Sequence, residues 1–120
     1  MNKKTIVLGA SAKVDRYSNK AVRMLMQNQH DVVPLGFENA VINGKEIQTD
    51  WKDYDNIDTV TLYLNPARQK EYYNYILKQN PKRIIFNPRT ENKELEQLAR
   101  ENRIETIEAC TLVMLSTKQY

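Results

Sequence analysis

The sequence predicts an α/β fold, namely a Rossmann-like, doubly wound parallel sheet of about five strands in three α/β/α layers. Two observations predict this class. Short apolar runs recur along the chain, and amphipathic segments of helical length separate them. Right-handed crossovers then place the helices on both faces of the sheet. The chain has 120 residues, enough for one core, so residues 1–120 are expected to form a single domain.

The first part of the chain predicts two strands with a helix between them. Residues 5–9 (TIVLG) form a continuous apolar run, which is typical of a strand buried on both faces. Ser18 is suited to cap the next helix. The second strand, residues 31–36, is expected to end at Pro34, because proline removes a ladder hydrogen bond. The apolar stripe of the helix consists of Ala21, Val22, Leu25 and Met26.

The middle of the chain predicts a tight turn, a strand and a helix. Asn43-Gly44 between short apolar stretches is typical of a small hairpin. Residues 58–64 predict the third strand. Asn65-Pro66 then supplies an N-cap and a first-turn proline for the helix that follows. The inward face of that helix is expected to carry Tyr73, Ile76 and Leu77.

The last part of the chain predicts two more strands. Residues 82–87 and 104–108 predict the fourth and fifth strands. Thr90 or Asn92 caps the helix between them. Residues 109–120 are expected to form a final helix or a strand. The apolar positions at helical spacing after the cap are Leu95, Leu98 and Ala99.

Composition argues against several classes of partner. The 18 Lys and Arg residues are interleaved with 15 Asp and Glu, and the net charge is only +3, so no nucleic acid is expected to bind. One cysteine cannot form an internal disulfide, as is typical of a reducing compartment. The apolar run near the N-terminus is too short for a signal peptide, and no stretch approaches the roughly 20 apolar residues of a membrane span. We therefore expect a soluble cytoplasmic protein that does not bind membranes.

The topology rule for doubly wound sheets selects the candidate site. Ligands of such sheets bind beyond the carboxyl ends of the strands, where the strand order reverses. The segments after Gly9, Pro34, Leu64 and Phe86 are therefore the candidates.

The first of these segments has the features of a phosphate-binding turn. Gly9, Ala10 and Ser11 carry no bulky side chains, so a phosphate can approach the N-terminus of the first helix. Lys13 and Arg16 can add charge-assisted hydrogen bonds. A plain connection with solvated cations is the alternative.

The dinucleotide fingerprint is incomplete. Only Gly9 of the G-x-G-x-x-G pattern is present. NAD binding also needs an acid at the end of the second strand, and Glu38 lies past that point. The anion is therefore expected to belong to a nucleotide-like ligand other than NAD.

The order of short motifs resembles that of the CoA-binding domain family, whose fold is that of the N-terminal domain of the succinyl-CoA synthetase alpha subunit. The motifs are VLGAS at 7–11, DRYS at 15–18, VVPLGF at 32–37, IFNPR at 85–89, and ENKEL with a later alanine at 91–99. They follow one another as in the small bacterial members, over nearly the whole chain. The resemblance implies a pocket for coenzyme A.

The resemblance also implies which residues line that pocket. Those matching the phosphate motif are Gly9, Ala10, Ser11, Arg16 and Ser18, with Lys13 nearby. The nucleotide end would be bordered by Pro34, Leu35 and Gly36. The rest of the crevice would be lined by Asn65, Pro66, Asn87 and Pro88.

The chain departs from the family pattern at two turns. Leu35-Gly36-Phe37 replaces a V-N-P element, and Asn87-Pro88-Arg89 replaces a Q-x-G turn. Arg89 either binds an anion or fills space that the ligand needs. A crevice plugged by Arg89 or Phe37 would favour a protein that kept the fold and lost its ligand.

No catalytic residue or metal site is expected. His30 precedes the second strand, at the opposite end of the sheet from the crevice. Cys110 has no histidine partner, and Ser11 lies in no nucleophile motif. No cluster of His, Cys or acidic residues has metal-ligand spacing.

The sequence thus predicts a module that binds coenzyme A or an acyl-CoA without catalysis. Two alternatives remain. One is a redox-linked NAD(P)-binding domain. The other is a ligand-free interaction module, with a homodimer as one form of it.

Overall fold

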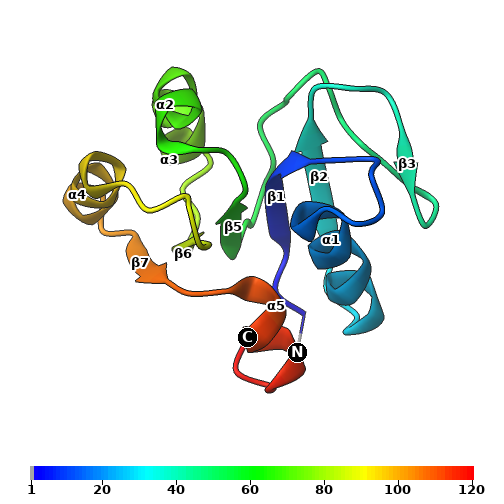
Figure 1. The fold of residues 1–120 in the computed structure, drawn as a ribbon. Helices are drawn as coiled ribbons and strands as arrows, with labels where there is room; N and C mark the ends of the chain where they lie inside the picture. Colours follow the sequence, from blue (N-terminus) through cyan, green and yellow to red (C-terminus); the bar gives the residue numbers. More distant parts are fainter. Residues whose placement is uncertain (1) are drawn as a thin grey trace.

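The computed structural model describes residues 2–120 and contains a five-stranded parallel sheet in the order β2-β1-β5-β6-β7. Figure 1 shows this sheet between two layers of helices, which confirms the predicted class. Each strand overlaps one of the five predicted strand segments. The strands are β1 (Thr5–Ala10), β2 (Val32–Gly36), β5 (Thr59–Leu62), β6 (Arg83–Phe86) and β7 (Glu105–Glu108).

The helices cover both faces of the sheet. In Figure 1, α1 (Tyr17–Gln27) and α5 (Thr111–Ser116) lie below it. The tail of the chain therefore ends in a helix rather than a strand. The upper layer is formed by α2 (Pro66–Gln69), the 3₁₀ turn η1 (Lys70–Tyr72), α3 (Tyr73–Lys78) and α4 (Lys93–Glu101).

Strand alternation divides the core into two clusters. On β1, Ile6 and Leu8 pack into the cluster that contains Leu95 of α4. Val7, between them, packs into the cluster that contains Leu25 of α1. All are at most 1% exposed. A central strand whose side chains are buried on both faces reads as a continuous apolar run, which is why β1 was recognisable.

The prediction that strand β2 ends at Pro34 is wrong. The Pro34 carbonyl accepts a hydrogen bond from the Gln48 N–H (2.9 Å), and the Gly36 N–H donates to the Gln48 carbonyl (3.0 Å). The backbone groups of Pro34 therefore point away from β1, because the N–H and C=O of one residue face the same side of a strand. The missing N–H removes no bond of the β1–β2 ladder, so the strand continues to Gly36.

The prediction that Ser18 caps α1 is also wrong. The N-cap is Arg16, in extended conformation, and no side chain accepts a hydrogen bond there. Ser18 lies inside the first turn and is buried.

The other capping and turn predictions hold. The Asn65 side chain accepts a hydrogen bond from the Arg68 N–H (2.9 Å). The cap of α4 is Asn92 and not Thr90, because the Asn92 side chain accepts a hydrogen bond from the Leu95 N–H (3.2 Å). The predicted hairpin joins β3 (Val41–Ile42) to β4 (Lys45–Glu46). Its two turn residues have positive φ angles, as a tight hairpin requires: Asn43 (47°) and Gly44 (84°).

His30 lies between α1 and β2, at the edge where the strands begin. Its Nδ1 accepts a hydrogen bond from the Lys3 N–H (2.9 Å), and its ring packs on Tyr120. Partial burial, aided by nearby positive charges, lowers the pKa of His30 below its ordinary value of 6.5.

This lowered pKa predicts an acid-sensitive contribution to stability. The unfolded chain binds a proton more readily than the folded one, so stability is full above the ordinary pKa and declines as pH falls through the folded value. We expect the melting temperature to drop between about pH 7 and pH 5. His30→Gln, which keeps a hydrogen-bond acceptor, should show a smaller drop over that window. Equal pH profiles for the two proteins would contradict this.

Candidate functional site

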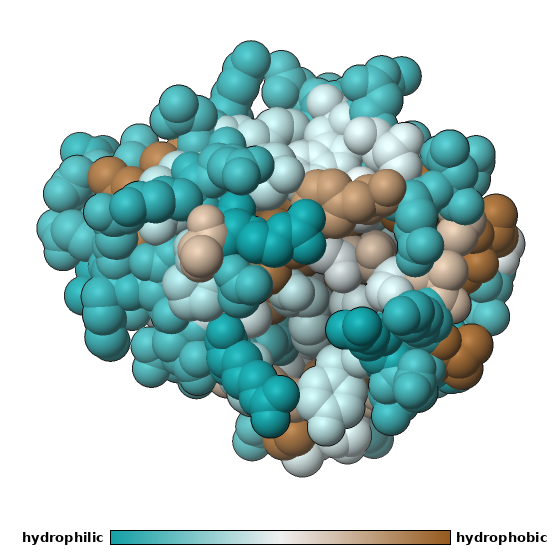
Figure 2. Space-filling model, turned by 45° about the horizontal axis from the view of Figure 1, so that its top comes forward, coloured by the Kyte–Doolittle hydropathy of each residue, from teal (hydrophilic) through white to brown (hydrophobic). Residues whose placement is uncertain are grey.

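The strand order reverses between β1 and β5, and two adjoining hollows lie at the carboxyl ends of these strands. Their volumes are about 320 and 420 Å³. Figure 2 shows this side obliquely, with pale and brown side chains in the middle and teal hydrophilic ones around them. The first hollow opens beside α1, and the second beside the end of β2. Residues that line both are Gly9, Ser11, Arg16 and Tyr63.

Gly9 shapes the turn that leaves β1. Its φ is +103°, a region that residues with side chains rarely adopt. A Cβ atom here would lie 3.1 Å from the Tyr63 carbonyl carbon and oxygen, and 3.1 Å from Leu64 Cδ2. The β1 turn therefore lies directly against the end of β5.

The loop between β1 and α1 is held by side chains of α1. The buried Asn19 donates to the Ser11 carbonyl (2.9 Å) and accepts from Arg23 Nε (2.8 Å). Arg23 also donates to the Val14 carbonyl (2.9 Å). In the loop itself, Ser11 Oγ accepts from the Lys13 N–H (3.1 Å). The loop is thus ordered before any ligand arrives.

The N-terminus of α1 faces the first hollow. No side chain caps it, and no acidic residue lies in its first turn. Its first N–H groups therefore carry the positive end of an 11-residue helix. Arg16, Tyr17 and Ser18 line the hollow at this point. The arrangement suits an anion such as a phosphate.

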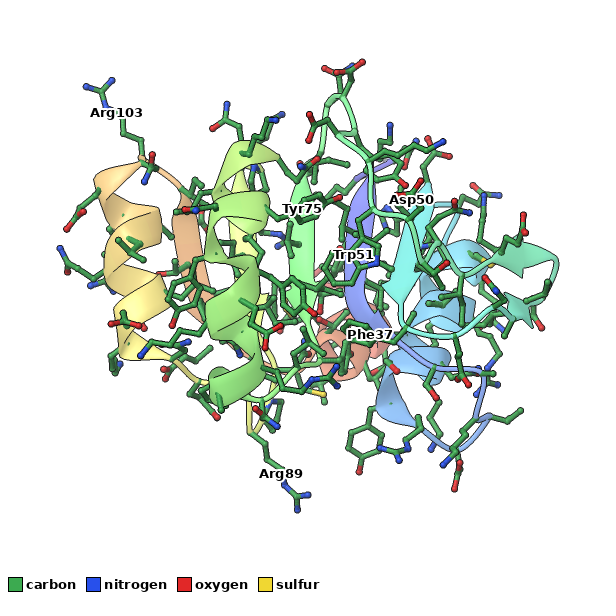
Figure 3. The ribbon with its side chains drawn as sticks, turned by 90° about the horizontal axis from the view of Figure 1, so that it is seen from above. Phe37, Asp50, Trp51, Tyr75, Arg89 and Arg103 are labelled. Atoms are coloured by element: carbon green, nitrogen blue, oxygen red, sulfur yellow. The ribbon has the colours of Figure 1, made fainter. Side chains whose placement is uncertain are left out.

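The opposite wall of the first hollow comes from the turns after β5 and β6. Asn65, Pro88 and Arg89 line it. Arg89 has a φ of 76°, and its side chain extends away from the molecule at this edge (Figure 3). The residue therefore borders the crevice without filling it.

Asn87 lies beneath this wall and is 2% exposed. Its side-chain amide donates to Thr61 Oγ1 (2.6 Å) and to the Leu62 carbonyl (2.8 Å). Its side-chain oxygen accepts from the Thr111 N–H (2.9 Å). The side chain joins β5, β6 and α5, and its polar atoms point into the protein.

Phe37 and Glu38 border the second hollow, immediately after β2. The Arg68 guanidinium lies over the Phe37 ring at 4.3 Å, and Trp51 packs on the same ring at 5.5 Å. Glu38 Oε1 accepts a hydrogen bond from the Ala12 N–H (3.2 Å). Figure 3 shows Phe37 beside Trp51 at this end of the sheet. Phe37 is 48% exposed, so it narrows the crevice without closing it.

Tyr63 has the most unusual environment in the site. Its hydroxyl is buried and makes no hydrogen bond in the described part of the chain. Burial, with a smaller contribution from Cys110, raises the pKa of Tyr63 far above its ordinary value. The phenol is therefore neutral near pH 7.

The structure brings together most of the predicted site residues, but not all of them. Pro34, Leu35 and Gly36 lie within β2, Asn87 points inward, and Pro66 lines neither hollow. Those that line the hollows are Gly9, Ala10, Ser11, Lys13, Arg16, Ser18, Asn65 and Pro88.

Tyr63 and Arg68 are among the lining residues that sequence reasoning missed. Each had a positional signal, since Tyr63 directly follows β5 and Arg68 lies in the turn that Asn65 caps.

Two kinds of feature are absent from residues 2–120. Across residues 2–120, no three His, Cys, Asp or Glu side chains lie where they could hold a metal ion. No helix in the same range is long and apolar enough to span a bilayer.

Comparison with known proteins points to one family and one fold. Residues 3–116 match a family described as "CoA binding domain". A solved structure described as an uncharacterized protein is 45% identical, with a TM-score of 0.97 over 100% of this chain and 99% of that one. No curated protein matches the chain.

Two thermophile structures are more distant. A hypothetical protein from Pyrococcus horikoshii OT3 is 25% identical, with a TM-score of 0.86 over 97% of this chain and 83% of that one. A Thermus thermophilus protein, cell-free ID.343, is 20% identical, with a TM-score of 0.83 over 99% and 91%. The second likeness concerns the fold alone.

Proposed function

Because the chain belongs to the CoA-binding domain family, we propose that it binds coenzyme A or an acyl-CoA and does not itself catalyse a reaction. The observation that carries this proposal is the uncapped N-terminus of α1, which faces a hollow lined by Gly9 and Arg16. Coenzyme A carries a pyrophosphate, and helix N-termini with free N–H groups bind such anions.

The charges around the two hollows support the same ligand. Lys13, Arg16, Arg68 and Arg89 line one or both of them, against Asp15 and Glu38. The excess of cations favours a ligand with several negative charges. In this assignment Arg16 binds the pyrophosphate beside the helix N-terminus, and Lys13 adds a second cation.

The positions of the titratable groups support a non-catalytic role. His30 lies at the opposite edge of the sheet, and it lines neither hollow. An NAD(P)-binding role is less well supported, because only Gly9 of the glycine fingerprint is present.

Calorimetric titration with coenzyme A tests the proposal. Replacing Arg16 with glutamine should weaken the affinity roughly tenfold, because a charge-assisted bond to phosphate is lost. Arg103→Gln is the matched control, since Arg103 lies at the far corner of the molecule in Figure 3 and should leave the affinity unchanged.

Two results would overturn the proposal. One is no heat and no thermal stabilisation with coenzyme A. The other is tighter binding of NAD or NADP than of coenzyme A, which would instead favour the redox-linked alternative.

A further inference from the structure

Two neighbouring side chains after β2 make contacts of a kind that a nucleotide makes with a protein. The Glu38 carboxylate accepts the Ala12 N–H in the β1–α1 loop (3.2 Å), as a phosphate oxygen would. The Phe37 ring lies against the Arg68 guanidinium (4.3 Å), as a base would. An anion and an aromatic ring are thus presented to the crevice by the chain itself.

The two contacts reach opposite walls of the crevice. Ala12 belongs to the β1–α1 loop, whereas Arg68 belongs to α2, which follows β5. Residues 37–38 therefore bridge the two sides of the point where the strand order reverses. They lie outside the regular ladder, because β2 ends at Gly36.

The bonding of Glu38 is weak enough to be exchanged for a ligand. The residue is exposed, and within residues 2–120 it has no cation within 4.0 Å, the ion-pair limit. The second hollow that it lines nevertheless contains Lys13, Arg16 and Arg68. A phosphate that enters this hollow would interact with these cations. It would also carry more negative charge than the single carboxylate of Glu38.

We propose that Phe37-Glu38 is a built-in competitor: the Ala12 N–H of the β1–α1 loop would bind an oxygen of the ligand's phosphates, and Glu38, which occupies this N–H, must be displaced when an anionic nucleotide binds. The inference rests on the proposed function and adds a ligand preference to it. Ligands with a pyrophosphate can displace the carboxylate, whereas ligands with a single carboxylate group gain little over it. The affinity for such a ligand is therefore lower than it would be if Glu38 did not occupy the β1–α1 loop.

Titration of Glu38 variants with coenzyme A, and separately with inorganic pyrophosphate, tests this. Glu38→Gln should bind both probes roughly three- to tenfold more tightly than the unaltered protein, because the competing charged acceptor is gone. Glu38→Asp keeps the charge but shortens the side chain, so it should also bind more tightly. Glu46→Gln, in the exposed β4 strand, removes an equal charge outside both hollows and should leave the affinity unchanged.

The amide resonance of Ala12 gives a second readout that does not depend on affinity. It should move in ligand-free Glu38→Gln, and saturation with pyrophosphate should bring the unaltered and variant proteins to the same position. Equal or weaker binding by Glu38→Gln, with coenzyme A still binding the unaltered protein, would overturn the inference alone. No binding of coenzyme A by either protein would overturn the proposed function with it.

Discussion

Replacing Asn87 with alanine is expected to lower the free energy of unfolding by about 3 kcal/mol. The substitution leaves the Thr111 N–H without its acceptor and removes one donor from the Leu62 carbonyl. Both groups lie in the interior. It also leaves a cavity where β5, β6 and α5 meet. Leaving one buried polar group unpaired costs about 1–3 kcal/mol, so two such losses and the cavity account for the total.

Urea denaturation followed by circular dichroism measures this effect. Asn102→Ala is a suitable control, because the Asn102 side chain is exposed and donates only to the Leu98 carbonyl of its own helix end. The control should lose no more than about 0.5 kcal/mol. A loss below about 1 kcal/mol for Asn87→Ala would mean that the buried network is dispensable.

Replacing Gly36 with alanine is expected to cost a similar amount, about 3 kcal/mol, for a steric reason. A Cβ atom at this position would lie 2.6 Å from the Ala10 carbonyl oxygen and 2.9 Å from Ile47 Cγ2. The closer neighbour is backbone, so it cannot swing aside as the end of a side chain can. Relief of the clash requires β1 and β2 to separate where Ala10 pairs with Gly36.

Gly44→Ala separates steric from conformational causes. Gly44 has a φ of 84°, but a Cβ there would meet nothing within 4 Å. Only the cost of the backbone conformation remains, about 1 kcal/mol. If the melting temperatures of the two variants fell equally, the close approach of β1 and β2 would not be the reason for glycine at position 36. Movement of Ala10 should also weaken coenzyme A binding in Gly36→Ala only.

The inner strands were predictable because buried parallel strands are continuous apolar runs, whereas the edge strand β7 is more polar and only partly buried. The error at Pro34 had a specific cause. The sequence shows that proline lacks an N–H, but it does not show which side of the strand that position faces. In the sheet this side meets Gln48 rather than β1. Ser18 was misjudged for a related reason, since a serine in the first turn of a helix resembles a cap at the sequence level.

The phosphate turn was more predictable than the walls of the crevice. Gly9 to Ser18 are contiguous, so their proximity follows from the chain. The walls are assembled from separate turns whose side chains can face either way. Asn87 was expected to face the crevice and instead faces the core. Glu38 was considered only as an acid lying past the point that NAD binding needs, and its contact with Ala12 depends on a bend after Gly36 that the sequence does not show.

Pro34 has a consequence for association between copies of the chain. A sheet grows by adding a strand when its outermost strand presents a row of unpaired backbone groups. At the middle of the β2 edge, Pro34 has no N–H, and Gln48 already binds the Pro34 carbonyl and the Gly36 N–H. At the other edge, β7 begins and ends with glutamate. The proline that left the ladder intact thus protects the sheet against strand addition at β2, and charged side chains on the edge strand disfavour such addition at β7.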